Sequence, residues 1–186
     1  MQKKLIVVSG PSGVGKGTIV KTLIKRRSDV VESVSCTTRA PRTGEVHGRE
    51  YYFLSKEDFL KRIEEDDFLE YDNHFGNYYG TPKSFVRETL KEKSVILEID
   101  VVGGLNAKKA FPDCVLVMIA PPSEEELKRR LTSRATESEE EIANRLQRLS
   151  YELSQKDKYD FVIVNDELEQ AIADLSAIVD GKYKNE

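Results

Sequence analysis

Apolar residues along the chain follow two patterns that alternate from one end to the other. Four short runs are almost continuously apolar, which predicts strands buried on both faces, as in a parallel sheet: residues 4–9, 94–99, 114–120 and 161–164. Between these runs apolar residues recur every three or four positions, the spacing of an amphipathic helix. Strands that alternate with helices predict an α/β fold with a mostly parallel sheet flanked by helices.

Serines followed by acidic residues mark the expected starts of three helices, at Ser55, Ser123 and Ser138. A serine oxygen can accept a hydrogen bond from a backbone N–H of the first turn, and acidic residues favour that end of a helix. A fourth helix is expected from about residue 167. Each helix has an apolar stripe that we interpret as core packing: Phe59, Leu60 and Ile63; Leu127 and Leu131; Ile142, Leu146, Leu149 and Leu153; and Leu168, Ile172, Leu175 and Ile178.

The segment from 33 to 85 departs from this alternation. It is rich in tyrosine and glycine, and two short strand-like runs, 51–54 and 68–71, flank one predicted helix. We expect this segment to be an inserted α+β lobe lying over a core formed by 1–32 and 86–186. The whole chain of 186 residues suits a single domain.

Composition and charge limit the classes of function. The formal net charge of −4 argues against a general nucleic-acid binder. No apolar run approaches the roughly 20 residues needed to span a bilayer, and the N-terminus enters a strand at once, without the pattern of a signal peptide. Cys36 and Cys114 are expected to be reduced thiols that pack in the interior. We therefore predict a cytoplasmic protein without nucleic-acid or membrane partners; the oligomeric state is left open.

The motif GPSGVGKGT, residues 10–18, lies between the first predicted strand and an expected helix, the context of a phosphate-binding P-loop. Its backbone N–H groups and the helix N-terminus would form a nest for an anion. All nine residues are candidates for binding a nucleotide: Gly10, Pro11, Ser12, Gly13, Val14, Gly15, Lys16, Gly17 and Thr18. The usual pattern has serine or threonine directly after the lysine. Because Gly17 intervenes here, Thr18 is a candidate metal ligand outside that pattern.

A second group of residues has the chemistry of an anion site. Arg39 and Arg42 are three residues apart around Pro41, so their guanidinium groups can converge on one anion. Arginine binds phosphate through a planar pair of donors, and the hydroxyls of Tyr51 and Tyr79 could add neutral donors. Without a further signal, an exposed arginine or a packed tyrosine is the more common explanation for each of these residues taken alone.

Seven segments supply that signal, in the order GPSGVGKGT, SVSCTTRAPRTGEVHGREYYF, DFLEYDNHFGNYYGTP, ILEIDVVGG, IAPPSEEELKRRL, SRATESEEEIANRL and FVIVND. They span nearly the whole chain, and together they closely resemble the guanylate kinase family. The resemblance implies a P-loop core, a GMP-binding lobe at 33–85 and a short helical lid at about 123–155. It also implies an enzyme of purine nucleotide metabolism that transfers a phosphoryl group from ATP to GMP, and to dGMP, with Mg²⁺ as cofactor.

The resemblance assigns the phosphate of GMP to Arg39, Arg42, Tyr51 and Tyr79, and its base to Ser35, Glu70 and Thr81. The chemistry of guanine agrees with the second set. Guanine presents two adjacent donors, N1–H and the N2 amine, which one carboxylate can accept together, and two acceptors, O6 and N7, which suit hydroxyl donors. Adenine lacks the donor pair and would leave Glu70 unpaired, so we predict a strong preference for GMP.

Two carboxylates, Glu98 and Asp100, lie two residues apart at the end of a predicted strand. In an open α/β sheet, ligands bind beyond this end of the strands. Asp100 is a candidate for holding Mg²⁺ through water. Glu98 could face either the guanine or the metal, because the family often has aspartate at this position. Asn165 and Asp166, after the last strand, match positions that contact the adenine of ATP.

The family's lid carries two arginines that stabilise the migrating phosphoryl group, and Arg134 and Arg145 match them. With Lys16 and Arg42 they form the expected catalytic set. Ser133 and Ala135 replace the glycines that commonly flank the first lid arginine, which should stiffen the lid.

Two other classes of function remain as alternatives. A guanylate-kinase-like domain can be a binding module without activity, but such modules typically lose the P-loop or phosphate residues, which this chain retains. A kinase for another small phosphate ester could use the same fold. The combination of Glu70, Ser35 and Thr81 argues against that second alternative.

Overall fold

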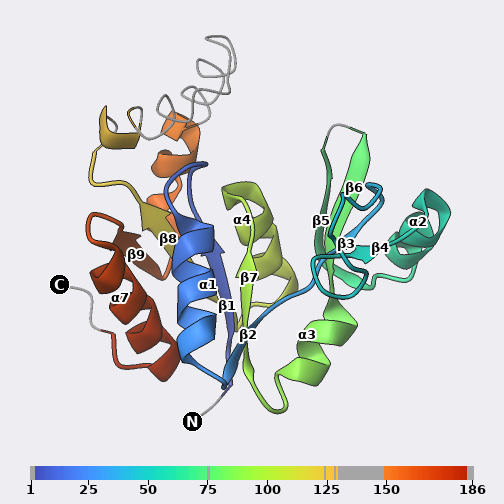
Figure 1. The fold of residues 1–186 in the computed structure, drawn as a ribbon, viewed down its shortest axis with the longest axis horizontal. Coiled ribbons are helices and arrows are strands. Elements are labelled where there is room, and N and C mark those ends of the chain that lie inside the picture. The colour runs from blue at the N-terminus through green and yellow to red at the C-terminus, as the bar shows by residue number, and fades with distance from the viewer. Residues whose placement is uncertain (1–2, 75, 124, 128, 130–148, 184–186) are drawn as a thin grey trace.

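The computed structural model describes residues 3–183, with the exception of residues 75, 124, 128 and 130–148. In chain order its elements are β1 (Leu5–Ser9), α1 (Lys16–Arg26), β2 (Val30–Glu32), β3 (Cys36–Thr37), β4 (Tyr52–Phe53), α2 (Lys56–Glu64), β5 (Phe68–His74), β6 (Asn77–Pro82), α3 (Lys83–Thr89), β7 (Ser94–Glu98), α4 (Val101–Ala110), β8 (Val115–Ala120), a short 3-10 helix (Lys156–Lys158), β9 (Phe161–Val164) and α7 (Leu168–Asp180). Two sheets organise these elements and stand beside one another in Figure 1. Within the described part of the chain, no helix is both long and apolar enough to cross a bilayer.

The first sheet has five strands in the order β2-β7-β1-β8-β9, and every neighbouring pair is parallel. The four strands predicted from apolar runs are confirmed, each within one residue of its expected bounds. The sequence does not predict β2, because its three residues contain an apolar run of only two valines. The α/β fold with a mostly parallel sheet is therefore confirmed.

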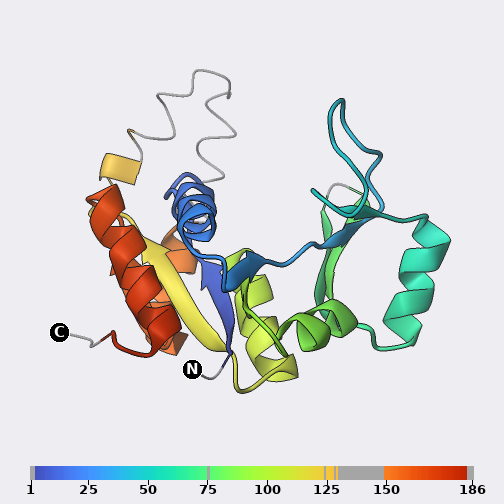
Figure 2. The same cartoon turned by 60° about the horizontal axis from the view of Figure 1, so that its bottom comes forward.

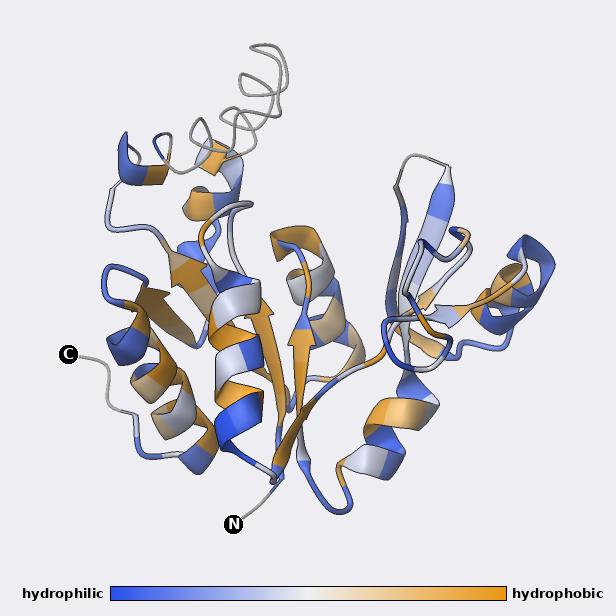
Figure 3. Cartoon of the chain, viewed as in Figure 1, coloured by the Kyte–Doolittle hydropathy of each residue, from blue (hydrophilic) through white to orange (hydrophobic). Residues whose placement is uncertain are grey.

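Successive residues of a strand point to opposite faces, so each apolar run contributes to two layers of core. Ile6 and Val8 of β1 pack with α1 and α7, whereas Leu5 and Val7 pack with α3 and α4. Figure 3 shows apolar residues along these central strands and hydrophilic residues on the outer parts of the helices. Burial on both faces explains why the strand runs lack a polar alternation.

The predicted helix starts agree with the structure where it describes them. Ser55 caps α2, because its Oγ accepts the N–H of Asp58 at 3.0 Å, and Ser123 accepts the N–H of Glu126 at 3.1 Å. The last helix, α7, begins one residue after the expected position. The start at Ser138 lies outside the described residues.

The second sheet has the order β4-β3-β6-β5, with antiparallel pairs except between β3 and β4. All its strands come from the tyrosine-rich segment. Its small core stacks Phe59 of α2 on Phe68, with ring centroids 4.4 Å apart, beside Cys36. Cys36 and Cys114 are both buried and free of disulfides, as predicted. The division of the chain into core, lobe and lid stays a prediction.

Helix α4 packs on β1 in the first sheet and on β5 in the second, and Figure 1 shows it between them. Gly104 allows the first contact: a Cβ there would lie 2.6 Å from the Oγ of Ser9 and 2.9 Å from the hydroxyl of Tyr159. Those hydroxyls donate to backbone carbonyls at the start of α4, Ser9 to Asp100 at 3.2 Å and Tyr159 to Val101 at 3.3 Å. The start of α4 is therefore fixed against the end of β1.

Replacing Gly104 with alanine should destabilise the fold. In an exposed helix this change would stabilise by about 1 kcal/mol, because alanine has the higher helix propensity. At Gly104 the added methyl overlaps two hydroxyl oxygens, and overpacking of this kind costs about 1–3 kcal/mol. Urea unfolding should show the loss for Gly104→Ala, whereas Asn106→Ala on the exposed side of α4 should stay within about 0.5 kcal/mol of wild type. A Gly104→Ala variant as stable as wild type would contradict this close packing.

Candidate active site

The loop between β1 and α1 has the conformation of an anion-binding loop. Gly10, Gly13 and Gly15 have φ angles of 143°, 83° and 98°, which residues with side chains resist. Gly10 also has no room for a side chain, because a Cβ would lie 2.2 Å from the carbonyl oxygen of Ile119 in β8. Gly15 is the cap of α1, so the loop leads directly into the helix N-terminus, where backbone N–H groups favour an anion.

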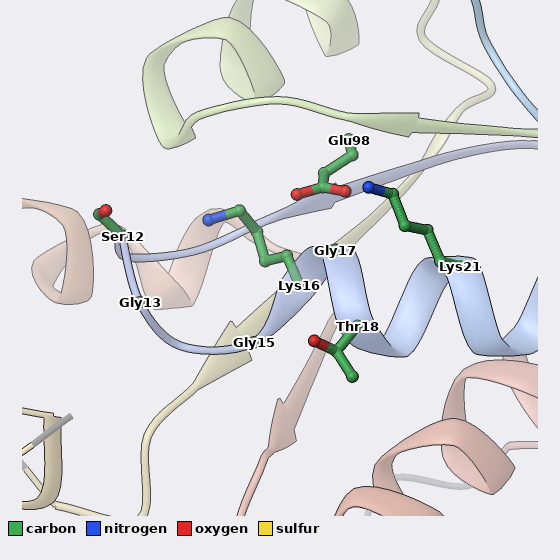
Figure 4. Close-up of a pocket in the computed structure, with 8 residues that line it drawn as sticks. All are labelled: Ser12, Gly13, Gly15, Lys16, Gly17, Thr18, Lys21 and Glu98. Atoms are coloured by element: carbon green, nitrogen blue, oxygen red, sulfur yellow. The ribbon is translucent and has the colours of Figure 1, made fainter. Parts of the chain in front are cut away.

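A pocket of about 400 Å³ lies against this loop. Its lining, drawn in Figure 4, consists of Ser12, Gly13, Gly15, Lys16, Gly17, Thr18, Lys21 and Glu98. Six of the nine residues of the motif therefore face the pocket. Of the other three, Pro11 and Val14 are buried beneath the loop, and Gly10 packs on β8.

The side chain of Lys16 is folded over its own loop. Its Nζ donates to the carbonyl oxygens of Gly10 at 2.6 Å and Pro11 at 3.0 Å. Burial lowers the pKa of Lys16, and the charges of three carboxylates act against this effect: Glu98, Glu152 and Asp100. The amine is held at the loop, where it can exchange carbonyl partners for phosphate oxygens.

Glu98, at the end of β7, forms one wall of the pocket. Figure 4 shows its carboxylate between the side-chain ends of Lys16 and Lys21. Burial raises the pKa of Glu98, and the two lysines oppose that shift. A Cβ on Gly17 would lie 3.4 Å from Oε2 of Glu98, so the glycine that interrupts the usual P-loop pattern faces a carboxylate. Thr18 lies on the opposite side of α1 from Glu98 in Figure 4.

Asn165 supports the loop from below. It is 7% exposed, and its side-chain amide donates to the carbonyl oxygen of Val14 at 2.7 Å. A Cβ on Gly15 would lie 2.5 Å from the same nitrogen. Asp166 is exposed next to it. The contact of these two residues with adenine stays a prediction. Asn165 also has a structural role, because its hydrogen bond to Val14 supports the loop.

Glu70 and Thr81 are paired across β5 and β6, and Ser35, directly before β3, lies beside them because β3 pairs with β6. The hydroxyl of Thr81 donates to Oε1 of Glu70 at 2.8 Å, and Oγ of Ser35 lies 3.3 Å from Oγ1 of Thr81. Because a hydroxyl carries one hydrogen, Ser35 is the donor to Thr81 in this arrangement. The three side chains form a hydrogen-bonded chain that ends on one carboxylate.

The carboxyl group of Glu70 lies in a setting that disfavours its charge. Burial raises the pKa of Glu70 to about 7, with a smaller contribution from the charge of Asp100, while the hydrogen bond from Thr81 opposes the shift. An unliganded Glu70 therefore changes between its neutral and ionised forms near neutral pH.

The four residues expected at an anion lie in one group. The guanidinium carbon of Arg39 is 5.6 Å from the ring centre of Tyr51, and the rings of Tyr51 and Tyr79 meet edge to face with centroids 5.9 Å apart. Arg39 also forms an ion pair with Glu45. The side chain of Arg42 is exposed, and its charge acts on the hydroxyl of Tyr51.

Asp100 lies between the P-loop and the Glu70 chain. It caps α4, and its Oδ1 accepts the N–H of Gly103 at 2.7 Å. A Cβ on Gly103 would lie 3.2 Å from this oxygen and 3.5 Å from Oε2 of Glu70. The charge of Asp100 acts on both Lys16 and Glu70. The first turn of α4 therefore connects the two regions.

Two predicted catalytic residues, Arg134 and Arg145, lie outside the described residues, as do Ser133 and Ala135. Three charged residues of the site are not predicted from the sequence: Lys21, Glu45 and Glu152. A charged residue on a helix or loop is usually solvated, so their type and spacing give no signal. Only the folded chain shows that Glu152 is buried and that its charge acts on Lys16.

Comparison with known proteins identifies the family. The family model described as guanylate kinase matches residues 2–182. The chain is 50% identical to the guanylate kinase of Caldanaerobacter subterraneus subsp. tengcongensis, over 96% of this chain and 87% of the relative. It is 51% identical to the guanylate kinase of Clostridium perfringens strain SM101, over 94% and 82% of the two chains. The chain belongs to the guanylate kinase family.

Solved structures agree. The crystal structure of guanylate kinase from Anaplasma phagocytophilum has a TM-score of 0.74 and 33% identity, with 98% of this chain and 87% of that chain covered. A shikimate kinase from Bacteroides thetaiotaomicron, 13% identical, has a TM-score of 0.52 over 95% and 98% of the two chains and shares the fold alone.

Replacing Glu70 with glutamine should stabilise the unliganded fold at neutral pH. The ordinary pKa of a glutamate is 4.5, whereas that of Glu70 in the folded chain is about 7. The folded state therefore holds this proton more tightly than the unfolded state, and stability falls as pH rises from 4.5 to 7. Below that interval the carboxyl is neutral in both states, so the wild-type protein loses no stability there.

Urea unfolding of both proteins across this pH range measures the effect. The gain of Glu70→Gln over wild type should grow as pH rises through the interval and then level off. A difference that does not depend on pH would contradict the raised pKa.

Proposed function

We propose that this protein catalyses the ATP-dependent phosphorylation of GMP, and of dGMP, to the diphosphate in purine nucleotide metabolism. Membership of the guanylate kinase family supports the reaction. The observation that carries the choice of acceptor is the carboxylate of Glu70, which is partly buried and is oriented by Thr81. It lies close to the carboxylate that caps α4, at the edge of the P-loop region. dGMP is included because no residue is assigned to the 2′-hydroxyl.

The base of the acceptor nucleotide would supply hydrogen-bond donors to the carboxylate of Glu70. The carboxylate can accept N1–H and the N2 amine of guanine together, and these donors favour its ionised form. Thr81 keeps the carboxylate in orientation, and the hydroxyl of Ser35 can turn from Thr81 toward O6 or N7. The phosphate of GMP would bind among Arg39, Arg42, Tyr51 and Tyr79.

The donor would bind at the P-loop. Backbone N–H groups of the loop that leads into α1 would hold the phosphates of ATP, and Lys16 would move its amine from the loop carbonyls to the outer phosphates. Asn165 and Asp166 would lie at the adenine. Asn165 also holds the loop in shape through Val14, so it acts on phosphate binding as well.

Transfer would occur directly between the two nucleotides. A phosphate oxygen of GMP attacks the γ-phosphorus of ATP, and the bond to the bridging oxygen of ADP breaks. No general base is needed, because the second pKa of a phosphate monoester is about 6 and the attacking oxygen is already ionised. The task of the protein is to align two anions and neutralise their repulsion, for which Lys16, Arg42, Arg134 and Arg145 are the expected cations.

The residues around the pocket fit Mg²⁺ held mainly by phosphate and water, which this ion prefers to an all-protein cage. The described part of the chain has no group of three or more His, Cys, Asp or Glu side chains able to hold a metal. We assign Glu98 and Asp100 as water-mediated holders. The position of Glu98 in the pocket wall favours the metal over guanine, and Thr18 is the weaker candidate. When bound, Mg²⁺ neutralises charge on the β- and γ-phosphates.

Acceptor choice tests this proposal. In a coupled turnover assay with GMP, dGMP, AMP, CMP and UMP, kcat/KM for GMP should exceed that for AMP by about 10⁴, because AMP leaves Glu70 unpaired. Glu70→Gln should lower kcat/KM for GMP roughly 10- to 100-fold, since an amide cannot accept both donors equally well. The exposed control Glu88→Gln should have no effect. Equal kcat/KM for AMP and GMP would contradict the proposal.

Removing one cationic side chain at a time tests the mechanism of phosphoryl transfer. Lys16→Ala should abolish transfer while the protein stays folded, because Lys16 is the first residue of α1 and its side chain is not part of the hydrophobic core. Arg134→Ala and Arg145→Ala should lower kcat by about 10²–10³ and change KM for GMP far less, as expected when a transition-state contact is removed. Arg129→Ala, which removes an exposed partner of Glu126, is the matched control. If Arg134→Ala or Arg145→Ala kept a near-normal kcat, the assignment of that arginine as catalytic would be wrong.

A further inference from the structure

The expected phosphate site contains a carboxylate of its own. Both oxygens of Glu45 lie 2.9 Å from Nη2 of Arg39, and Oε2 also accepts the backbone N–H of Arg42 at 2.7 Å. Among ion pairs in the described part of the chain, this pair is the least exposed, with 16% of the Arg39 side chain and 18% of the Glu45 side chain accessible. One glutamate therefore contacts both arginines expected at GMP.

The local sequence directs Glu45 to this place. The N–H of Glu45 donates to the carbonyl oxygen of Arg42 at 3.0 Å, which closes a four-residue turn. Gly44, at the third position of the turn, has a φ of 89°, the angle that a type II turn requires there. A Cβ on Gly44 would meet no atom within 4 Å, so the glycine is needed for its backbone angle and not for space. The turn carries the Glu45 side chain back over the Arg42 N–H.

Arg39 and Arg42 differ in the donors they still offer to a ligand. A guanidinium has five N–H donors, and its two bidentate edges, Nε with Nη2 and Nη1 with Nη2, share the Nη2 nitrogen. In Arg39 the Nη2 group faces Glu45, and Nη1 donates to the carbonyl oxygen of Ala40 at 2.7 Å. The Arg42 guanidinium is exposed, and the described residues supply it with no hydrogen bond or ion pair. Arg39 is therefore held by the protein, whereas Arg42 is open to an anion.

We propose that Glu45 is a positioning residue for the phosphate of GMP. It fixes the guanidinium of Arg39 and the backbone at Arg42, so that the Arg42 guanidinium and the hydroxyls of Tyr51 and Tyr79 surround one anion. This inference rests on the proposed function.

Two effects of Glu45 oppose one another. Its negative charge repels a phosphate, but Arg39 neutralises that charge at 2.9 Å, and the two arginines with Glu45 keep one net positive charge. Without Glu45, two guanidinium groups would repel each other, and the long side chain of Arg39 would lose its fixed orientation. Binding would then have to restore that order, which weakens affinity. In a variant without this carboxylate, we expect the lost orientation of Arg39 to weaken GMP binding more than the removal of the Glu45 charge strengthens it.

The test compares Glu45→Gln with a matched control, Glu50→Gln. Glu50 has contacts of the same two kinds, since it pairs with Arg49 and accepts the N–H of Val46 at 2.7 Å, but it contacts neither Arg39 nor Arg42. Calorimetric titrations with GMP and with guanosine, which has the base without the phosphate, separate the two parts of the site. Glu45→Gln should raise Kd for GMP about tenfold and leave Kd for guanosine nearly unchanged. Glu50→Gln should change neither.

Turnover measurements give a second readout. Glu45→Gln should raise KM for GMP in proportion to Kd, with little change in kcat or in KM for ATP. If this variant does not fold, Glu45→Asp keeps the charge but is one methylene too short for both contacts, and it should show the same selective loss for GMP.

Three results would overturn the inference. A lower Kd for GMP in Glu45→Gln would mean that Glu45 competes with the phosphate, and an unchanged Kd would mean that it has no role. An equal loss for GMP and guanosine would mean a general structural defect. Failure of the wild-type protein to bind GMP would instead overturn the proposed function itself, and the inference with it.

Discussion

The packing of α4 between β1 and β5 is the contact on which the arrangement of the two binding regions depends. Gly104 allows this helix to approach the hydroxyls of Ser9 and Tyr159, and Gly103, next to it, lies in ordinary contact range of Glu70. A side chain at Gly104 would force the helix away from β1, because its Cβ would lie 2.6 Å from the Oγ of Ser9. The distance between the P-loop and the Glu70 carboxylate thus depends on a close approach that one glycine in the first turns of α4 permits.

The same turn brings charge into a confined space. Asp100 caps α4 and acts on Lys16 on one side and on Glu70 on the other. Burying carboxylates without full partners costs stability, as the raised pKa of Glu70 indicates. A ligand with two adjacent donors would remove that cost on binding. Under the proposed function, the unfavourable setting of Glu70 in the unliganded protein would be a source of selectivity, because a base without those donors leaves it uncompensated.

Much of the fold follows from the sequence, because strands buried on both faces leave continuous apolar runs. The short elements do not: β3 has two residues, and the start of α4 contains two glycines that weaken any helix prediction. Gly104 is explained by neighbours distant in sequence, Ser9 and Tyr159, which only the folded chain identifies.

The candidate site likewise has parts that the sequence predicts and parts that only the folded chain shows. Local motifs predict the P-loop and the arginine pair, since loop geometry and spacing are local properties. The sequence cannot show that Glu98 faces the P-loop pocket, that Asn165 bonds to Val14, or that Glu45 holds Arg39. Each of these contacts depends on how a side chain turns after the backbone has folded, and residue types alone do not determine that.

In the proposed enzyme the P-loop and the Glu70 carboxylate are two ends of one site for two nucleotides. A crystal structure of the chain with an analogue that joins adenosine and guanosine through a polyphosphate tests this arrangement most directly. The guanine edge should lie within hydrogen-bond distance of Glu70 and the polyphosphate at the P-loop beside Lys16, with one analogue spanning the first turn of α4. A guanine bound away from Glu70, or a polyphosphate outside the P-loop, would contradict it.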